Sequence, residues 1–131
     1  MTKQVIVMRT DLNMRKGKMI AQGAHASMAF LLNGLQYDIP SKKEYVTAEI
    51  NLRKNVIEWA EHGQTKICVR VDSEKELLEI YKAADIAGLE VHIITDSGRT
   101  EFGGVPTRTC LAIGPNKSEE IDKITGHLKL L

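Results

Sequence analysis

The segment Gln4-Val5-Ile6-Val7-Met8-Arg9 is nearly apolar throughout and rich in β-branched residues. β-Branched residues favour strands, and a strand without polar alternation is typical of the buried interior of a sheet. The segment therefore predicts a central strand near the start of the chain, and this strand indicates where the rest of the fold has to be built.

Strands and helices alternate along the remainder of the chain. Further strands are predicted over 65–71, 90–95 and 108–114, and helices from about 15 to 33–34, over 46–61, 73–87 and 118–125. A loop broken by Pro40 is expected over 35–43. This alternation indicates an α/β sandwich. A loop without a helix joins the last two strands, which favours antiparallel pairing and a mixed sheet.

Local signals mark several helix ends. Ser73-Glu74-Lys75-Glu76 is a capping box, in which side chains at both ends satisfy backbone N–H groups of the first turn. Gly63 and Gly88 stand where a glycine is expected after the last turn of a helix. The helix predicted over 46–61 has four apolar residues available for burial, Ile50, Val56, Ile57 and Ala60.

The composition bounds the class of protein. With 131 residues, of which 43% are hydrophobic and 27% charged, the chain is expected to form one soluble globular domain. A net charge of +1 neither requires nor excludes a nucleic-acid partner. Binding a polyanion would require the positive charge to be concentrated on one face.

The sequence carries no signal for a membrane or for export. The longest uncharged stretch, 19–37, contains four polar side chains and lacks the sustained apolarity of a membrane span. Met1-Thr2-Lys3-Gln4 runs directly into the first predicted strand, so no signal peptide is expected. We therefore expect a cytosolic protein without a membrane partner.

The two cysteines and the histidines suggest packing rather than metal binding. Cys68 and Cys110 each lie within an apolar strand-like run and are predicted to be buried structural residues. No cluster has metal-ligand spacing, so no metal site and no cofactor are expected. Packing or surface roles are also expected for the remaining residues of this kind: His62, His92 and His127, a core Trp59 and a loop-anchoring Phe102.

The first predicted helix carries three polar side chains, Lys18, Gln22 and His25, at positions i, i+4 and i+7. At about 100° per residue they fall within roughly 60° of one helix face. An apolar stripe is expected on the opposite face, formed by Ile20, Ala24, Met28 and Leu31. Taken alone, the polar wedge fits either a solvated surface or one wall of a functional site.

A second polar feature is the loop from Asp96 to Thr109. It follows the carboxyl end of a predicted strand, where α/β sheets commonly place ligands. Three glycines, two arginines and three threonines accompany Asp96 within this stretch. The loop fits either a long polar hairpin connection or a ligand site.

Taken together, these segments strongly resemble the archaeal and eukaryotic type (type II) of peptidyl-tRNA hydrolase. Ordered blocks spread over nearly the whole chain carry the resemblance: Val7-Met8-Arg9-Thr10-Asp11-Leu12-Asn13-Met14, Gly17-Lys18-Met19-Ile20-Ala21-Gln22-Gly23-Ala24-His25-Ala26, Asp96-Ser97-Gly98-Arg99-Thr100, Ile113-Gly114-Pro115 and the ending Ile121-Asp122-Lys123-Ile124-Thr125-Gly126-His127-Leu128-Lys129-Leu130.

The resemblance implies a single domain over residues 1–131 with a three-layer α/β/α sandwich, in which helices cover both faces of a mixed four-stranded sheet. It also implies a homodimer that hydrolyses the ester between a peptide and the terminal ribose of tRNA, without a metal or cofactor. Such an enzyme frees tRNA after aborted translation.

Site residues follow from the resemblance by position. Lys18 matches the essential helix lysine of the family, Asp96 and Thr100 match its Asp-x-Gly-Arg-Thr loop, and Thr109 matches the threonine that opens the last strand. These four are the expected catalytic residues. Residues expected to bind the substrate are Gln22, His25 and Arg99 from the motifs, and Arg15, Lys16, Arg108 and Lys117 as a basic surface for the acceptor stem.

The chemistry of these groups suits ester hydrolysis. Asp96 could act as general base on a water or orient it, and Lys18 could stabilise developing negative charge or hold a phosphate. The hydroxyls of Thr100 and Thr109 would orient water, acid or substrate carbonyl. An ester has a good leaving group, so positioning and oxyanion stabilisation can suffice.

Three departures from the family pattern favour an alternative. Glu101 places negative charge beside a site that should meet RNA, the connection over 35–46 differs, and Gly23-Ala24 lacks a hydroxyl or thiol. The alternative is a non-catalytic tRNA- or protein-binding module of the same fold.

Overall fold

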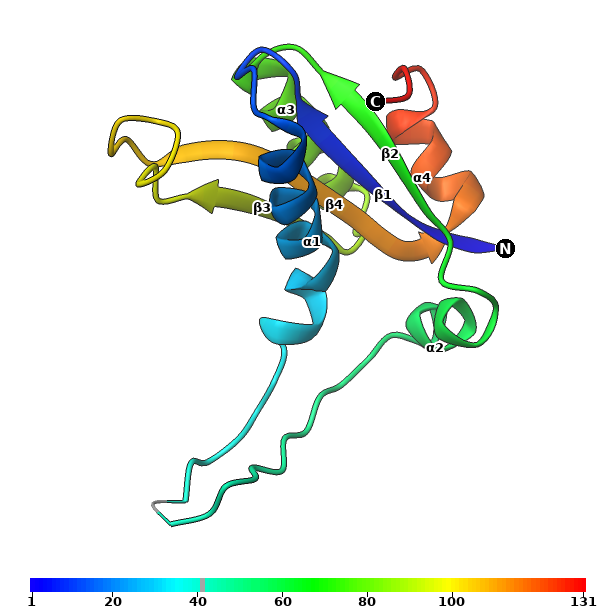
Figure 1. Ribbon diagram of the computed structural model, residues 1–131. Helices are drawn as coiled ribbons and strands as arrows, with labels where there is room; N and C mark the ends of the chain where they lie inside the picture. Colours follow the sequence, from blue (N-terminus) through cyan, green and yellow to red (C-terminus); the bar gives the residue numbers. More distant parts are fainter. Residues whose placement is uncertain (41) are drawn as a thin grey trace.

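The computed structural model of the protein describes residues 1–40 and 42–131. Figure 1 shows the order of the elements in this part of the chain: β1 (Thr2–Arg9), α1 (Lys16–Leu32), α2 (Lys54–Glu61), β2 (Lys66–Val71), α3 (Glu74–Ile86), β3 (Val91–Asp96), β4 (Thr107–Lys117) and α4 (Ser118–Thr125).

The strands form one mixed sheet in the order β2-β1-β4-β3. β1 pairs parallel with β2 and antiparallel with β4, and β4 pairs antiparallel with β3. The prediction of a central first strand in a mixed α/β sheet is therefore confirmed. The antiparallel pairing of β3 with β4 follows from the short loop that joins them.

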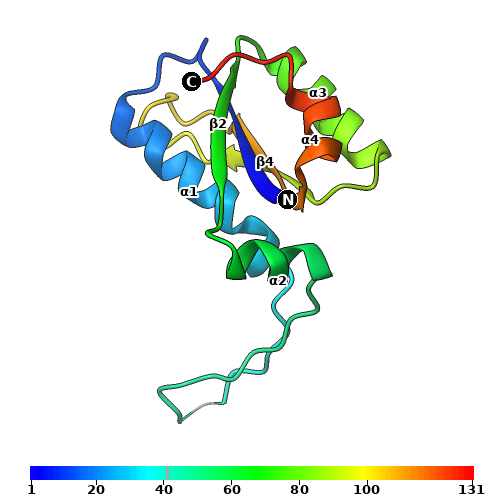
Figure 2. The same cartoon turned by 90° about the vertical axis from the view of Figure 1, so that its right-hand side faces the viewer.

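Helices cover both faces of the sheet, as Figure 2 shows with α1 on one side and α3 and α4 on the other. Alternate residues of β1 face the two sides: Val5 and Val7 pack in a cluster with Leu77 of α3, and Ile6 and Met8 pack on the α1 side. β1 is apolar at successive positions because both of its faces are buried.

The orientation of α1 differs from the prediction. Ile20 and Met28 are 73% and 49% exposed, so the expected apolar stripe faces outward rather than into the core. The residues that α1 buries against the sheet are mostly small or aromatic: Gln22, Gly23, Ala26, Ala29 and Phe30. Small side chains let the helix lie close to the sheet, and a Cβ built on Gly23 would lie 3.8 Å from the Met8 side chain.

The helix predicted over 46–61 is shorter than expected. α2 begins only at Lys54, because Gln36 and Glu49 form an antiparallel bridge with backbone N···O distances of 2.8 and 2.9 Å. Of the residues expected to be buried, Val56 is buried, Ile50 is half-buried, and Ile57 and Ala60 are exposed. The loop predicted over 35–43 includes Ser41, which lies outside the described residues.

The predicted helix ends are confirmed. Ser73 Oγ accepts a hydrogen bond from the backbone N–H of Glu76 at 3.1 Å. Gly63 and Gly88 have φ values of +95° and +73°, which favour glycine after a last helical turn. β4 extends beyond the predicted Gly114 to Lys117, because Asn116 and Lys117 pair with the start of β1.

The cysteines differ in burial. Cys110 is buried as predicted, whereas Cys68 is exposed. Cys68 lies on the side of edge strand β2 that faces away from the cluster containing Val69 and Val71, and α1 does not extend over it. In the described part of the chain, no helix has the length and apolarity needed to cross a membrane.

Candidate active site

Lys18 and Asp96 form an ion pair between α1 and the end of β3. Lys18 Nζ lies 2.9 Å from Asp96 Oδ1, and the two side chains are only 13% and 14% exposed. Side chains alternate along a strand, so Asp96 shares the α1-facing side of β3 with Ile94 and with His92, which contacts Asn33 at the end of α1. The pairing of these two motif residues over 78 positions is thus set by α1 crossing this face.

Three donors converge on the Asp96 carboxylate. Oδ1 accepts from Lys18 Nζ and, at 3.2 Å, from Gln22 Nε2, and Oδ2 accepts from the backbone N–H of Gly98 at 2.9 Å. The hydrogen bond from Lys18 holds the pKa of Asp96 below its usual value, and the Gly98 bond adds to this effect. Asp96 is therefore a charged acceptor, suited to orienting a water and weak as a base.

The loop after β3 completes the surroundings of Lys18. Lys18 Nζ also donates to Thr100 Oγ1 at 2.9 Å, and it lies 5.6 Å from the centroid of the Phe102 ring. Phe102 also packs against the α1-side cluster, which fits its expected role as a loop anchor. Lys18 is thus fixed at the centre of Asp96, Thr100 and Phe102.

Gly98 has a specific structural role in this loop. Its φ is +83°, and a Cβ at this position would lie 2.2 Å from the carbonyl oxygen of Val105. The carbonyl of Gly98 in turn accepts from Gly104 N–H at 2.8 Å, which closes the loop. Only glycine fits this approach, and the resulting turn aims the Gly98 N–H at Asp96.

A β-bulge brings Thr109 to the same network. The register between β3 and β4 passes from Ile94↔Cys110 to Thr95↔Arg108, which leaves Thr109 as the extra residue of β4. A bulge redirects side chains, and Thr109 Oγ1 here donates to Gln22 Oε1 at 2.5 Å. Thr109 is fully buried, so it contacts Asp96 only through Gln22.

Gln22 therefore links the two halves of the site. Its side chain is 2% exposed and bridges Thr109 to Asp96 through opposite ends of its amide. Sequence reasoning placed Gln22 on the substrate side and missed this connecting position. The signal for it was present in the i, i+4 spacing from Lys18, which puts both side chains toward β3.

The neighbouring thiol is not a candidate nucleophile. Cys110 Sγ donates to the backbone carbonyl of Gln22 at 3.4 Å. Burial raises the pKa of the Cys110 thiol to about 11. A thiol of this kind stays protonated at neutral pH and acts as a buried apolar residue.

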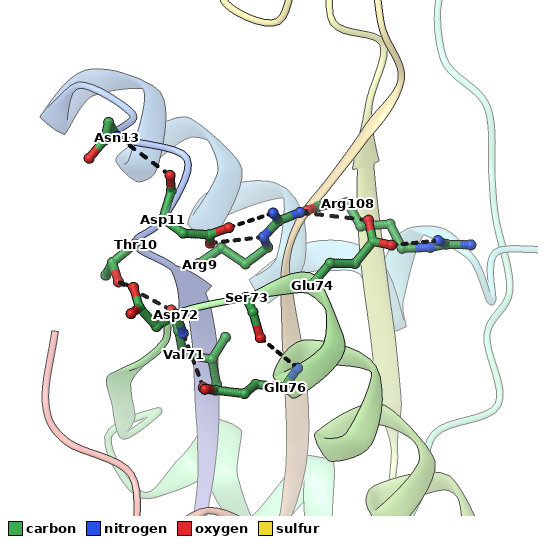
Figure 3. A network of polar contacts seen from close by, with 10 residues as sticks. All are labelled: Arg9, Thr10, Asp11, Asn13, Val71, Asp72, Ser73, Glu74, Glu76 and Arg108. Atoms are coloured by element: carbon green, nitrogen blue, oxygen red, sulfur yellow. Dashed lines mark hydrogen bonds and ion pairs between the residues drawn. The ribbon is translucent and has the colours of Figure 1, made fainter.

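A second polar network supports the loop between β1 and α1, as Figure 3 shows. Arg9 donates to both carboxylate oxygens of Asp11, at 3.1 and 2.7 Å, and to the carbonyl of Arg108 at 2.9 Å. Glu74 lies 3.7 Å from the guanidinium groups of both Arg9 and Arg108. The hydrogen bond to Asp11 raises the pKa of Arg9 and lowers that of Asp11. The network fixes the β1–α1 loop to β4 beside Thr109.

The basic residues predicted to contact RNA do not all gather at the site. Arg15 and Lys16 are exposed at the start of α1, and Arg99 is exposed in the loop after Asp96. Arg108 is directed to Glu74 on the α3 side. Lys117 ends β4 at the edge of the sheet farthest from Thr107, about 30 Å along the strand at its usual rise per residue.

Glu101 is paired rather than isolated. Its carboxylate lies 3.5 Å from Arg15 Nε, and its side chain is 22% exposed. The ion pair offsets the negative charge that the sequence placed beside the site, and it ties the Asp96 loop to the start of α1.

An open groove leaves the site along α1. This α1–β3 groove has a volume of about 460 Å³ and lies between α1 residues Gln22 to Asn33 and β3 residues Ile93 to Asp96. His25 is exposed and lines it, so His25 faces the groove rather than the ion pair. Among the residues that the structure describes, no group of three or more His, Cys, Asp or Glu side chains could hold a metal ion.

The other singled-out residues serve packing. Trp59 is buried against Phe30 in an edge-to-face contact at 6.0 Å, and its Nε1–H donates to the carbonyl of Thr65 at 2.9 Å. His62 ends α2 with its ring nitrogen 2.7 Å from the carbonyl of Glu58. Neither approaches the network around Asp96.

Known proteins resemble the chain over its whole length. Residues 2–131 match the family model described as peptidyl-tRNA hydrolase PTH2. A relative named peptidyl-tRNA hydrolase from Methanocaldococcus jannaschii is 46% identical over 129 residues, which cover 98% of this chain and 99% of the relative. A relative of the same name from Methanothermobacter thermautotrophicus is 46% identical over 129 residues, again covering 98% and 99% of the two chains.

A solved structure shares the fold at low identity. A protein of unknown function from Agrobacterium tumefaciens aligns with a TM-score of 0.57 and 13% identity, covering 99% of this chain and 97% of that one. At this identity the likeness concerns the fold alone.

Proposed function

The chain belongs to the peptidyl-tRNA hydrolase PTH2 family, and on that premise we propose how its residues carry out the reaction. The protein hydrolyses the ester that joins a peptidyl or N-blocked aminoacyl group to tRNA. The observation that carries the mechanism is the 2.9 Å ion pair of Lys18 and Asp96, which joins two separate family motifs at one end of a groove.

In this mechanism Asp96 orients the attacking water. Its lowered pKa keeps it ionised, and an ionised carboxylate aligns a water as a hydrogen-bond acceptor. The water oxygen attacks the ester carbonyl, the bond to the ribose oxygen breaks, and a proton from the water ends on that oxygen. The products are a peptide carboxylic acid and free tRNA.

Lys18 stabilises the negative charge that develops on the carbonyl oxygen. It is already positioned by Asp96 and Thr100, so little reorganisation accompanies the reaction. Gln22 and Thr109 act as positioning residues, because Thr109 reaches Asp96 only through the Gln22 amide. No step in this scheme requires a metal or a cofactor.

The acceptor stem is proposed to approach from the start of α1. Arg15, Lys16 and Arg99 are exposed on this side of the Lys18–Asp96 pair. RNA helices expose their backbone and hydroxyl groups more readily than their base edges, so charge and shape would govern recognition. Lys117 and Arg108 are left out of this surface because of their positions.

The test is the release of free tRNA from N-blocked aminoacyl-tRNA in the presence of a chelator. We expect release by the parent protein and its loss in Lys18→Ala and Asp96→Ala. The non-catalytic module predicts no release, with both variants indistinguishable from the parent protein. The main sequence argument for that module was Glu101, whose charge is offset by Arg15.

The protein is further proposed to be a cytoplasmic homodimer, as the family resemblance implies. An apolar groove of about 620 Å³, the α1–β2 groove, offers a surface for a second copy. It is lined by the outward stripe of α1 and the uncovered side of β2, including Ile20, Met28, Cys68 and Leu131. Cell fractionation that tracks the protein with translating ribosomes tests the compartment.

A further inference from the structure

β3 lies at an edge of the sheet and has one unpaired side (Figure 1). Its backbone pairs with β4 alone among the described residues, and no other backbone hydrogen bond reaches Val91–Asp96. An open strand edge presents N–H and C=O groups that can pair with another extended chain. β3 is therefore available for strand addition.

The residues whose backbone groups point to this open edge can be identified. Gly114 N–H donates to the carbonyl of Glu90 at 2.7 Å, so the pair Glu90–Gly114 is of the hydrogen-bonded type. Directly opposed residues of an antiparallel ladder alternate between bonded and non-bonded types. With the register Ile93↔Leu111, the N–H and C=O of Ile93 point outward, as do those of Thr95 two residues later.

The open edge borders the α1–β3 groove, and this groove is continuous with the catalytic network. Gln22 and Asp96 line one end of it, and Leu32 and Asn33 line the other. The α1 residues that line it fall on one side of the helix, so an extended chain beside β3 would lie under α1. A chain placed there would reach the Lys18–Asp96 pair without a turn.

The charges favour a peptide over RNA as the occupant. No lysine or arginine lines the α1–β3 groove, and its lining includes the apolar residues Ala29, Leu32 and Ile94. Phosphate groups require cations, which lie instead at Arg15, Lys16 and Arg99 near the start of α1. The two parts of a peptidyl-tRNA thus have separate chemistries on opposite sides of the ion pair.

We propose that the α1–β3 groove binds the peptide of the substrate as an extended chain added to the free edge of β3. The inference rests on the proposed function. The ester is at the carboxyl end of the peptide and must lie at Asp96, which ends β3, so the peptide runs parallel to β3. Ile93 and Thr95 supply backbone hydrogen bonds, which would make recognition largely independent of peptide sequence.

The groove also sets a length. The wall from Asp96 back to Ile93 and on to the end of the groove accommodates about three to four residues at about 3.3 Å each. We therefore expect kcat/KM to rise with peptide length up to about four residues and then to level off.

The experiment compares N-acetyl-alanyl-tRNA with N-acetyl-tetraalanyl-tRNA, which share the blocking group, the ester and the tRNA. The test variant is Thr95→Pro, which removes the outward N–H without removing a bond to β4, since proline is tolerated at such edge positions. The matched control is Thr95→Ala, which keeps the N–H and loses only the exposed side chain.

The unmodified protein is expected to prefer the longer substrate by about three- to tenfold, the range that one or two hydrogen bonds support. Thr95→Pro should abolish this preference and leave the short substrate unaffected, and Thr95→Ala should keep the preference. Equal kcat/KM for both substrates in the unmodified protein, or an unchanged preference in Thr95→Pro, would overturn the proposal.

A second variant separates the peptide site from an indirect effect on Asp96. If Thr95→Pro lowers both substrates equally, Leu32→Ser at the far end of the groove decides: the proposal requires a loss confined to the longer substrate. A change in inhibition by deacylated tRNA in Leu32→Ser would assign the groove to RNA and overturn it. Failure of the unmodified protein to hydrolyse either substrate would instead refute the proposed function itself.

Discussion

Asp96 is the residue whose charge state matters most, because three donors point at its carboxylate. Its pKa lies below the usual value of 3.8, chiefly through Lys18. The ion pair is complete at pH values above that usual value and is lost as the pH falls through the lowered pKa. Activity that depends on ionised Asp96 should therefore persist into more acidic solution than an ordinary aspartate would allow.

Replacing Lys18 by methionine tests both roles of this lysine. We expect kcat to fall by about 10²- to 10³-fold, the usual effect of removing one group that stabilises an oxyanion. The pKa of Asp96 should rise toward its usual value, because its main cation is gone. Carbon NMR titration of the Asp96 carboxyl measures the second effect, with Lys16→Met as the control. An unchanged Asp96 pKa in Lys18→Met would contradict the assigned ion pair.

Thr109 and Gln22 give a second prediction at this scale. Thr109→Val keeps the shape of the side chain but leaves Gln22 Oε1 buried without its donor, so we expect a loss of about 1–3 kcal/mol in the free energy of unfolding. The kcat should fall as well, because Gln22 no longer holds Asp96 in place. Thr109→Ser retains the donor and should recover most of both quantities. Denaturant unfolding and single-turnover hydrolysis measure them; a Ser variant as impaired as the Val variant would argue against the hydrogen bond.

At the scale of elements, the loop between β3 and β4 depends on one glycine more than on its others. Gly98→Ala places a Cβ against the carbonyl of Val105, whereas a Cβ on Gly103 meets no atom within 4 Å. Both have positive φ, so Gly103→Ala should cost about 1–2 kcal/mol from backbone strain alone. Gly98→Ala should cost clearly more and should also lower kcat, because its N–H holds Asp96. Equal unfolding free energies for the two variants would contradict this account of the loop.

α1 shows how one helix serves two surfaces. Its inward side carries small residues and Gln22, and its outward side carries Ile20 and Met28. This arrangement leaves the α1–β2 groove uncovered and turns the edge that holds Lys18 toward Asp96. A helix with a bulky inward stripe would stand farther from the sheet and would carry Lys18 away from its partner.

For the whole molecule, the distribution of charge gives a prediction about tRNA. Arg15→Ala should reduce the slope of log Kd for deacylated tRNA against log salt by about one, as expected for one lost phosphate contact. Lys117→Ala, at the other end of β4, is the control and should leave the slope unchanged. Filter binding over a salt series measures both. Equal slopes in all three proteins would exclude the proposed approach from the start of α1.

The proposed homodimer gives the second prediction for the whole molecule. Ile20→Lys puts a charge into the α1–β2 groove and should yield monomers, since an unpaired charge is costly to bury at an interface. Ile86→Lys is the control, because Ile86 is 86% exposed on α3, on the other side of the sheet. Sedimentation equilibrium measures the mass. A monomeric parent protein would refute the homodimer, and a dimeric Ile20→Lys would place the interface elsewhere.

Much of the fold could be predicted because it depends on signals close together in the chain. The apolar run of β1, the capping box at Ser73 and the glycines at 63 and 88 each specify an element or its end through nearby residues. The helix expected over 46–61 was wrong in its first half, because the backbone pairing of Gln36 with Glu49 links residues 13 positions apart. Helix propensity alone contains no information about such a pairing.

The sequence by itself determined the α/β class, the mixed sheet and the motif residues, since these follow from periodicity and from resemblance in ordered blocks. Only the tertiary structure decided which side of α1 is buried, that Thr109 acts through Gln22, that Glu101 pairs with Arg15, and that Lys117 lies far from Asp96. The physical reason is that a side chain's partners depend on how close two elements approach and on their register. Both are set by the packing of small residues and by one bulge in β4, which no local pattern in the sequence reveals.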